Sequence, residues 1–227
     1  KLLVIEDAAQ AAGAVYKGQR VGAMGDVGVY SFNRYKNINI GEGGALLTND
    51  TSLYGRALHY HDLGAFIRNY EHGDETEPFV GINLRITEVQ GAMLNAQMSR
   101  LPGYLRALAA RRAAVAKLFE GVRGVRVSPH HDASGALTLT VLFDREEDAI
   151  EFAERTGAMR LYDSSKHVYT NWDAILERRA AHPKLDPWKW AARDVTYTPE
   201  TCARSLDILK RTCKIWFDPA RPLPLVK

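Results

Sequence analysis

Residues 27–50 constrain the fold more than any other stretch, because they contain two predicted strands joined by a polar loop. Residues 27–32 are rich in β-branched and aromatic side chains, which is typical of a buried strand. Residues 41–48 predict a turn that leads into a second strand. The polar segment between the two strands carries Lys36, and three glycines follow it closely.

Lys36 has two interpretations when this segment is considered alone. Glycines tolerate positive φ and carry no side chain, so nearby glycines let the backbone pass tightly round another group. An amine on such a loop could form a Schiff base, provided that burial or neighbouring charge favours its neutral form. A surface lysine in a glycine-rich hairpin fits the same pattern, and this one segment favours that plainer interpretation.

The start of the chain changes this balance. Residues 2–5 predict a fully apolar strand, and Asp7 and Gln10 follow it closely. In an open α/β sheet, ligands bind beyond the carboxyl ends of the strands, where Asp7 would lie. A carboxylate there can keep a ring nitrogen protonated while Lys36 holds an aldehyde carbon. Pyridoxal phosphate requires this combination of an electron sink and an imine.

Three blocks of the sequence resemble a known enzyme family. They are VIEDAAQAAGAVYKGQRVG at 4–22, YSFNRYKNINIGEGGALLTND at 30–50 and GINLRITEVQGAMLNAQMSRL at 81–101. In this order and spacing they resemble the signature blocks of the DegT/DnrJ/EryC1/StrS aminotransferases. These are fold-type I pyridoxal-phosphate enzymes, many of which aminate nucleotide-linked keto sugars. The resemblance covers about the first half of the chain closely, and the rest agrees in general pattern.

The resemblance implies a set of cofactor-binding residues. Lys36 would hold pyridoxal phosphate as the imine and later move the proton, and Asp7 would pair with the ring nitrogen. Gln10 would touch the ring hydroxyl and Ser31 would bind the phosphate. Asn83, in G-x-N-x-R, would reach the cofactor phosphate of a partner subunit. Without the resemblance, Ser31 could bond its own backbone and Asn83 could be a turn residue.

The implied fold class is α/β. Residues 1–120 would form the C-terminal part of an aspartate aminotransferase-like large domain with its linking helices, and residues 121–227 a small α+β domain. Strands predicted near 125–128, 136–143, 159–162 and 213–217, with helices at 146–156 and 199–212, favour that second domain.

The first domain contains the remaining predicted helices. A helix is expected over residues 53–63, after a cap region at 49–51. Thr87 and Gln90 predict a capping box for a helix that ends near residue 99. Pro102 fits the first turn of a separate helix that ends near residue 119.

Two features depart from the family pattern or stay open. The pattern usually has an arginine and then His-Gly in the region of the 53–63 helix, whereas this chain has His59, His61 and Asp62. Neither histidine is therefore given a role. The loop at 167–172 is rich in polar aromatic residues, which suit sugar or nucleotide contact but pack loops at least as often.

The bulk properties are those of an ordinary globular protein. Hydrophobic residues make up 46% of the 227 residues, and the formal net charge is only +3. Basic residues are scattered, which argues against a nucleic-acid partner, and no apolar run reaches the length of a membrane span. Cys202 and Cys213 are too few and too far apart for a metal cluster or disulfide framework, so unpaired thiols in a cytoplasmic enzyme are expected.

The sequence as a whole predicts transamination of a keto sugar, with glutamate as the implied amino donor and a homodimer with shared active sites. The chain starts at Lys1 and opens on a strand, so we expect a fragment that lacks an N-terminal part of the cofactor domain. A catalytically incompetent fragment, or a non-enzymatic binding or regulatory remnant, is the alternative. A pyridoxal-phosphate-dependent sugar dehydratase is less favoured, because that branch has histidine in place of the imine lysine.

Overall fold

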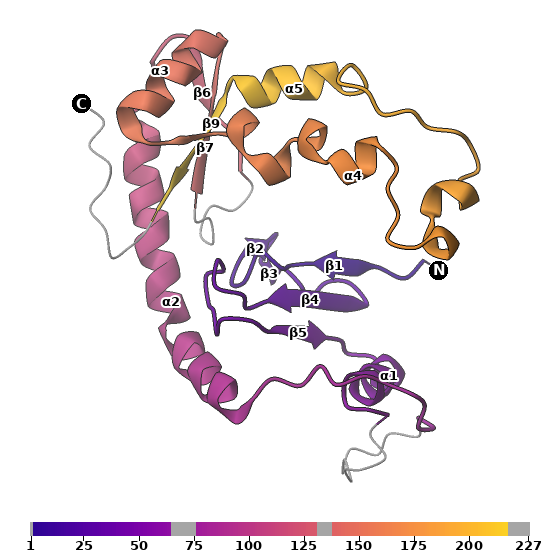
Figure 1. Ribbon diagram of the computed structural model, residues 1–227. Coiled ribbons are helices and arrows are strands. Elements are labelled where there is room, and N and C mark those ends of the chain that lie inside the picture. Colours follow the sequence, from indigo (N-terminus) through magenta and orange to yellow (C-terminus); the bar gives the residue numbers. More distant parts are fainter. Residues whose placement is uncertain (1, 65–75, 131–137, 218–227) are drawn as a thin grey trace. The chain divides into compact units, whose positions relative to one another are not determined.

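The computed structural model describes residues 2–64, 76–130 and 138–217. Contacts divide the chain into two compact units, one of residues 1–111 with 130–137 and one of residues 112–129 with 138–227 (Figure 1). The division falls inside a long helix, between Arg111 and Arg112. The sequence-based boundary after residue 120 stays a prediction.

The first unit is built on a three-stranded sheet of order β1-β4-β5 (Figure 1). Strand β1 (Ile5–Asp7) runs parallel to β4 (Val27–Ser31), and β5 (Gly44–Leu47) runs antiparallel to β4. The strand predicted at residues 27–32 and the second strand predicted within residues 41–48 are therefore confirmed as strands. A separate hairpin joins β2 (Val15–Tyr16) to β3 (Gln19–Arg20).

The predicted buried strand at residues 2–5 is wrong in position and in burial. Strand β1 begins only at Ile5, and Leu2 and Ile5 are 88% and 70% exposed. Among the described residues, β1 pairs on one side only, with β4. The apolar side chains that predict burial are thus not covered by other residues in the described part of the chain.

Glu6 holds a loop of the first unit in place. Its carboxylate accepts backbone hydrogen bonds from Gly22 at 2.8 Å and from Met24 and Gly25 at 2.5 Å. Close packing fixes the same loop, because a Cβ on Gly28 would lie 1.9 Å from the Gly22 carbonyl oxygen. The N–H groups of Gly22, Gly25 and Met24 hold the pKa of the Glu6 carboxyl below its usual range.

We expect Glu6→Gln to destabilise the protein near neutral pH and to matter progressively less in acid. The lowered pKa means that the folded state binds the Glu6 proton less readily than the unfolded chain. The stabilisation is therefore present above the ordinary carboxyl pKa and is lost as the pH falls through the folded-state value. Urea unfolding of both proteins from pH 7 to pH 3 measures this difference. A stability gap that stayed constant across that range would contradict the assignment.

Helix α1 (Thr51–His61) begins where the sequence predicts a cap. Asp50 is its N-cap, and the Asp50 carboxylate accepts a hydrogen bond from the Leu53 N–H at 3.0 Å. Such side-chain caps satisfy one of the N–H groups that a helix start leaves without a partner.

The two helices predicted on either side of Pro102 are in fact one helix, α2 (Glu88–Lys117). Its capping box is confirmed, because Thr87 N donates to Gln90 Oε1 at 2.9 Å and Gln90 N donates to Thr87 Oγ1 at 3.3 Å. Pro102 removes one backbone donor, yet packing holds the helix on both sides of it. Leu101 packs against the core of the first unit, and Leu105 Cδ1 approaches Gly13.

A small apolar cluster forms the core of the first unit. Its buried members are Ala12, Phe32, Ile38 and Ile40. Tyr30, Ala45, Leu94 and Leu101 pack against it. This core underlies the segment that follows β4, so it anchors the loop that carries Lys36.

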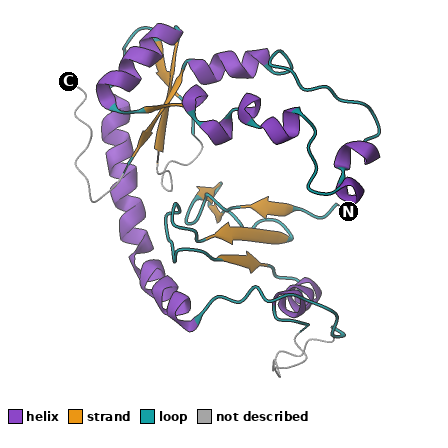
Figure 2. Cartoon of the chain, viewed as in Figure 1, coloured by secondary structure: helices purple, strands orange, loops and turns teal. Residues whose placement is uncertain are grey.

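The second unit contains a four-stranded antiparallel sheet of order β6-β7-β9-β8. These strands are β6 (Val125–Val127), β7 (Thr138–Phe143), β8 (Met159–Arg160) and β9 (Thr212–Trp216). Helix α3 (Glu146–Thr156) contacts β7, β8 and β9, and α5 (Ala203–Lys210) contacts β9 (Figure 2). The mixture of strands and helices agrees with the predicted α+β pattern.

Short helical turns fill the segment between β8 and α5. The strand and the helix predicted at the two ends of this segment are both longer than the observed ones. The strand predicted at 159–162 ends early because Leu161–Asp163 is a 3-10 turn, and the helix predicted at 199–212 is shorter. The other short helices are Ser165–His167, Tyr169–Asn171, α4 (Asp173–Leu176), Pro183–Leu185 and Pro187–Trp190.

The polar aromatic loop at 167–172 packs the second unit. The Tyr169 hydroxyl lies 2.7 Å from the Pro199 carbonyl oxygen and accepts a hydrogen bond from Cys202 N at 3.1 Å. Val168 is 1% exposed. These contacts favour a packing role for the loop, although Trp172 stays half exposed.

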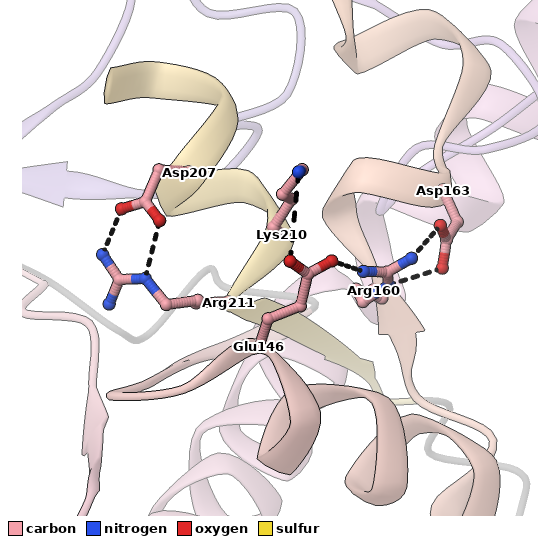
Figure 3. Close-up of polar contacts among 6 residues, drawn as sticks. All are labelled: Glu146, Arg160, Asp163, Asp207, Lys210 and Arg211. Carbon is pink, nitrogen blue, oxygen red and sulfur yellow. Dashed lines mark hydrogen bonds and ion pairs between the residues drawn. The ribbon is translucent and has the colours of Figure 1, made fainter. Parts of the chain in front are cut away.

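Ion pairs tie the start of α3 to β8 and to the turn that follows it. Arg160 contacts Glu146 Oε1 at 2.7 Å and both carboxylate oxygens of Asp163 at 2.7 and 2.8 Å. The hydrogen bonds to Asp163 contribute most to raising the pKa of Arg160. Figure 3 shows these contacts together with those of Lys210, Asp207 and Arg211.

The two cysteines are free, as predicted, and differ sharply in environment. Cys202 is exposed, whereas Cys213 on β9 is buried and its thiol donates to the Ala149 carbonyl at 3.3 Å. Burial raises the pKa of the Cys213 thiol to about 11. Because the thiolate is the reactive form, Cys213 should be inert in the native state.

We therefore expect Ellman's reagent to modify Cys202 readily and Cys213 only after unfolding. Peptide mapping of the modified protein before and after addition of guanidinium measures both sites. The Cys202→Ser variant is the control, since it removes the reactive site and leaves the buried one. Rapid native modification of Cys213 would show that its burial is wrong.

Candidate active site

The pairing of β1 with β4 brings two predicted site residues to one edge of the sheet. The strands are parallel with Asp7 opposite Val29, and Ser31 is the last residue of β4. Parallel strands end on the same side, so Asp7 and Ser31 both lie at the carboxyl edge. Asp7 is exposed, and its Oδ1 accepts a hydrogen bond from Ala9 N at 3.1 Å.

Lys36 lies on a tight turn directly after β4. The Asn33 carbonyl accepts a hydrogen bond from the Lys36 N–H at 3.0 Å, and Asn33 N donates to Ser31 Oγ at 3.4 Å. Both Ser31 and Lys36 are half buried. Ser31 and Lys36 thus belong to one short segment, and their joint contact with a bound group stays a prediction.

Asn37 is a buried polar residue whose contact no sequence pattern indicated. It is 8% exposed, and its Nδ2 donates to the Ala12 carbonyl at 3.1 Å. This contact ties the Lys36 turn to the segment that follows β1, which contains Gln10. The structure therefore brings together the two segments that hold Asp7, Gln10, Ser31 and Lys36. The only available signal was the position of Asn37 next to the candidate lysine.

The glycines after Lys36 serve the fold of the loop itself. A Cβ on Gly43 would lie 2.7 Å from Ile40 Cδ1, and one on Gly44 would lie 2.8 Å from the Tyr30 carbonyl oxygen. These glycines therefore let the loop approach neighbouring parts of the same chain closely.

Asn83 belongs to a separate segment, which is held against the end of α1. Ile82 N donates to the Tyr60 carbonyl at 2.8 Å, and Leu84 N donates to the His61 carbonyl at 2.9 Å. Asn83 is exposed, and its Oδ1 accepts a hydrogen bond from Arg85 N at 3.2 Å. The turn geometry expected of this residue type is thus present, and its role toward a partner subunit stays a prediction.

The two histidines of α1 make contacts within the chain. His59 is buried, with its ring centroid 6.1 Å from that of Phe79. Nδ1 of His61 lies 2.7 Å from the Leu58 carbonyl oxygen. His59 thus packs within the first unit, and His61 contacts a backbone carbonyl of its own helix.

Three further findings concern a groove, metal-ligating side chains and membrane-spanning helices in the described part of the chain. An open, mainly apolar groove of about 720 Å³ lies along β5 and α1, and none of the five candidate residues lines it. Within the described ranges, no three histidine, cysteine or acidic side chains gather as a metal site would require. No helix in those ranges combines the length and apolar character needed to cross a membrane.

Comparison with known proteins identifies the family. Residues 1–165 match the DegT/DnrJ/EryC1/StrS aminotransferase family. The chain belongs to that family. The match includes all five candidate residues and extends beyond the three blocks that carry the resemblance.

Several curated relatives carry the names of amino-sugar synthases or transaminases, and one is named a pleiotropic regulatory protein. GDP-perosamine synthase of Escherichia coli O157:H7 is 40% identical over 105 residues, covering 46% of this chain and 28% of that protein. The dTDP-3-amino-3,4,6-trideoxy-alpha-D-glucose transaminase of Streptomyces venezuelae is 36% identical over 125 residues, covering 55% and 31%. The chain thus spans about a third of the length of these relatives.

Solved structures show the fold that the family implies. The Escherichia coli GDP-4-keto-6-deoxy-D-mannose-3-dehydratase with bound hydrated PLP superposes with a TM-score of 0.69 at 16% identity. The match covers 97% of this chain and 57% of the dehydratase. The fold is therefore that of the fold-type I enzymes, and at this identity the likeness concerns the fold alone.

Proposed function

We propose that the full-length protein is a pyridoxal-phosphate-dependent aminotransferase that acts on a keto sugar of the nucleotide-linked kind, with glutamate as amino donor. One observation carries the proposal: the parallel pairing of β1 and β4 places Asp7 and the Ser31–Lys36 turn at the same sheet edge. Family membership supports the chemistry, and relatives such as GDP-perosamine synthase support the substrate class.

The residues at this edge fit the cofactor in chemical character. A phosphate requires donors, which the Ser31 hydroxyl supplies, and a ring hydroxyl can pair with the Gln10 amide. The Asp7 carboxylate can hold a ring nitrogen protonated, and the Lys36 amine can bond an aldehyde carbon. The Asn37 contact with Ala12 keeps the two contributing segments together, as a shared ligand requires.

Each residue then has a distinct task in amino transfer. When bound, pyridoxal phosphate supplies the electron sink. Asp7 maintains the charge of the ring nitrogen, which makes that sink effective. Lys36 would carry the proton that leaves the substrate carbon. Ser31 and Gln10 fix the orientation of the ring relative to Lys36.

Incubating the full-length protein with pyridoxal phosphate, glutamate and a nucleotide-linked keto sugar tests the proposal. We expect a visible absorbance band from the lysine-bound cofactor and a product whose mass shows an amine in place of the keto oxygen. A product that had lost a sugar hydroxyl would instead indicate a dehydratase. Absence of both the band and the product would indicate the non-enzymatic alternative.

We further propose a cytoplasmic homodimer in which Asn83 binds the cofactor phosphate of the partner subunit, with no nucleic acid or membrane as a partner. The family pattern supports this role, and the exposed turn at Asn83 is compatible with it. The turn uses the Asn83 Oδ1, so the amide nitrogen is the atom suited to donate to a phosphate.

Mixing the Lys36→Ala and Asn83→Ala variants, at a cofactor concentration too low to load Asn83→Ala by itself, tests the shared site. If the site is shared, a mixed dimer has one site with both changes and one with neither, so activity should partly return after subunit exchange. The rate of amino transfer before and after exchange measures the recovery. No recovery, with exchange shown by mass spectrometry, would mean that Asn83 serves its own subunit.

A further inference from the structure

We propose that Asp62 is a positioning residue that acts through Arg85 to hold the turn presenting Asn83. The inference rests on the proposed phosphate-binding role of Asn83. Asp62 itself would not touch the cofactor. It would fix the backbone that carries the phosphate donor.

The segment containing Asn83 is held against the end of α1 by its backbone. Asp62 and Asn83 form an isolated antiparallel bridge, and Leu63 N donates to the Ile82 carbonyl at 3.3 Å. A Cβ on Gly81 would lie 2.5 Å from the Tyr60 carbonyl oxygen, so the approach requires glycine there. The turn and the helix end therefore form one tightly packed element.

Aromatic packing also holds the part of the segment that precedes Asn83 against α1. The guanidinium of Arg56 on α1 lies 5.2 Å from the centroid of the Phe79 ring, and His59 packs against that ring as well. A cation over an aromatic face is attracted by the ring quadrupole. The segment is thus held before Asn83 as well as at it.

The ion pair between Asp62 and Arg85 holds the segment after Asn83. The Asp62 side chain is 3% exposed and contacts Arg85 Nη1, while the Arg85 side chain is 30% exposed. A carboxylate so deeply buried needs a charged partner, since desolvation is otherwise very costly.

Arg85 connects this ion pair to the Asn83 side chain. Its guanidinium contacts Asp62, and its backbone N–H donates to Asn83 Oδ1. Removing the Asp62 charge would release the guanidinium and loosen the backbone on which the Asn83 amide depends. The sequence departs from the family pattern at Asp62, so this support is not part of the motif that identified Asn83.

The test compares pyridoxal phosphate with pyridoxal, which lacks the phosphate, by absorbance titration of the full-length protein. The dissociation constant of pyridoxal divided by that of pyridoxal phosphate gives a ratio that isolates the contribution of the phosphate contacts. We expect Asn83→Ala and Asp62→Asn each to reduce this ratio about tenfold, mainly by weakening pyridoxal phosphate. Combining the two changes should reduce it little further, because both act on one contact. Asp62→Glu, which restores the charge, should recover part of the ratio.

Asp50→Asn is the matched control, because it alters a carboxylate at the other end of α1 and keeps a capping side chain. It should leave the ratio unchanged. If Asp62→Asn fails to fold, Asp62→Asn combined with Arg85→Gln removes both charges together and leaves neither buried alone. That double variant should show the same reduction in the ratio of the two dissociation constants.

The outcomes separate the inference from the proposed function. An unchanged ratio in folded Asp62→Asn, beside a reduced ratio in Asn83→Ala, would overturn the inference alone. Equal weakening of both ligands would show a merely structural role for Asp62 and would overturn it too. A parent protein that bound neither ligand would refute the proposed function, and the inference with it.

Discussion

Replacing Lys36 by alanine is expected to lower amino transfer by the full-length protein at least about a thousandfold, because one residue performs two tasks. Lys36 would hold the cofactor covalently and would move the proton at the substrate carbon. Its half-buried position on the turn after β4, five residues from Ser31, allows both tasks at one site. Single-turnover measurements of keto-sugar amination compare the variant with the parent.

Two further variants make this result specific. Lys36→Arg keeps a positive charge but cannot bond the aldehyde, so it should be as inactive as the alanine variant. Lys17→Asn removes an exposed lysine from the hairpin, where φ is 49° and asparagine is well tolerated. It should keep parental activity. Substantial activity in Lys36→Arg would show that the residue acts through charge alone.

Replacing Asp7 by asparagine is expected to lower turnover about a hundredfold or more while the protein retains much of its cofactor. The variant keeps an oxygen that can accept the hydrogen bond from Ala9 N, so the local turn should persist. It loses the negative charge that would keep the ring nitrogen protonated. Cofactor titration and steady-state turnover, measured on the same sample, separate binding from catalysis.

Asp7→Ala provides the comparison, because it removes both the charge and the turn acceptor. It should bind the cofactor less well than Asp7→Asn and show no higher turnover. Parental turnover in Asp7→Asn would mean that the carboxylate does not tune the ring nitrogen.

Local signals in the sequence predict much of the first unit. The Asp50 cap and the Thr87–Gln90 capping box each depend on residues within one helical turn. The strand around residues 27–32 has the β-branched and aromatic composition that is typical of strands. Such features depend on backbone preferences and short-range hydrogen bonds, which the order of residues specifies directly.

Features that depend on contacts between distant residues could not be predicted in this way. Pro102 suggests a helix break, yet packing on both of its sides keeps α2 continuous. Glu6 accepts hydrogen bonds from a loop sixteen and more residues away. The Asp62–Arg85 pair likewise joins residues that only the folded chain brings together.

The candidate site shows the same division. The resemblance implies roles for Asp7, Gln10, Ser31 and Lys36, and the parallel pairing of two strands brings the ends of their two segments to one sheet edge. The Asn37 contact that ties their segments together has no counterpart in the local pattern. Its partner, Ala12, offers only a backbone carbonyl, which every residue possesses.

Reduction of the cofactor-loaded protein with borohydride, followed by peptide mapping, tests the central claim most directly. Borohydride fixes a pyridoxal group on the lysine that holds it, and the label survives proteolysis. The proposed site predicts one labelled peptide, with the label on Lys36. A label on a different lysine, such as Lys17, would contradict it.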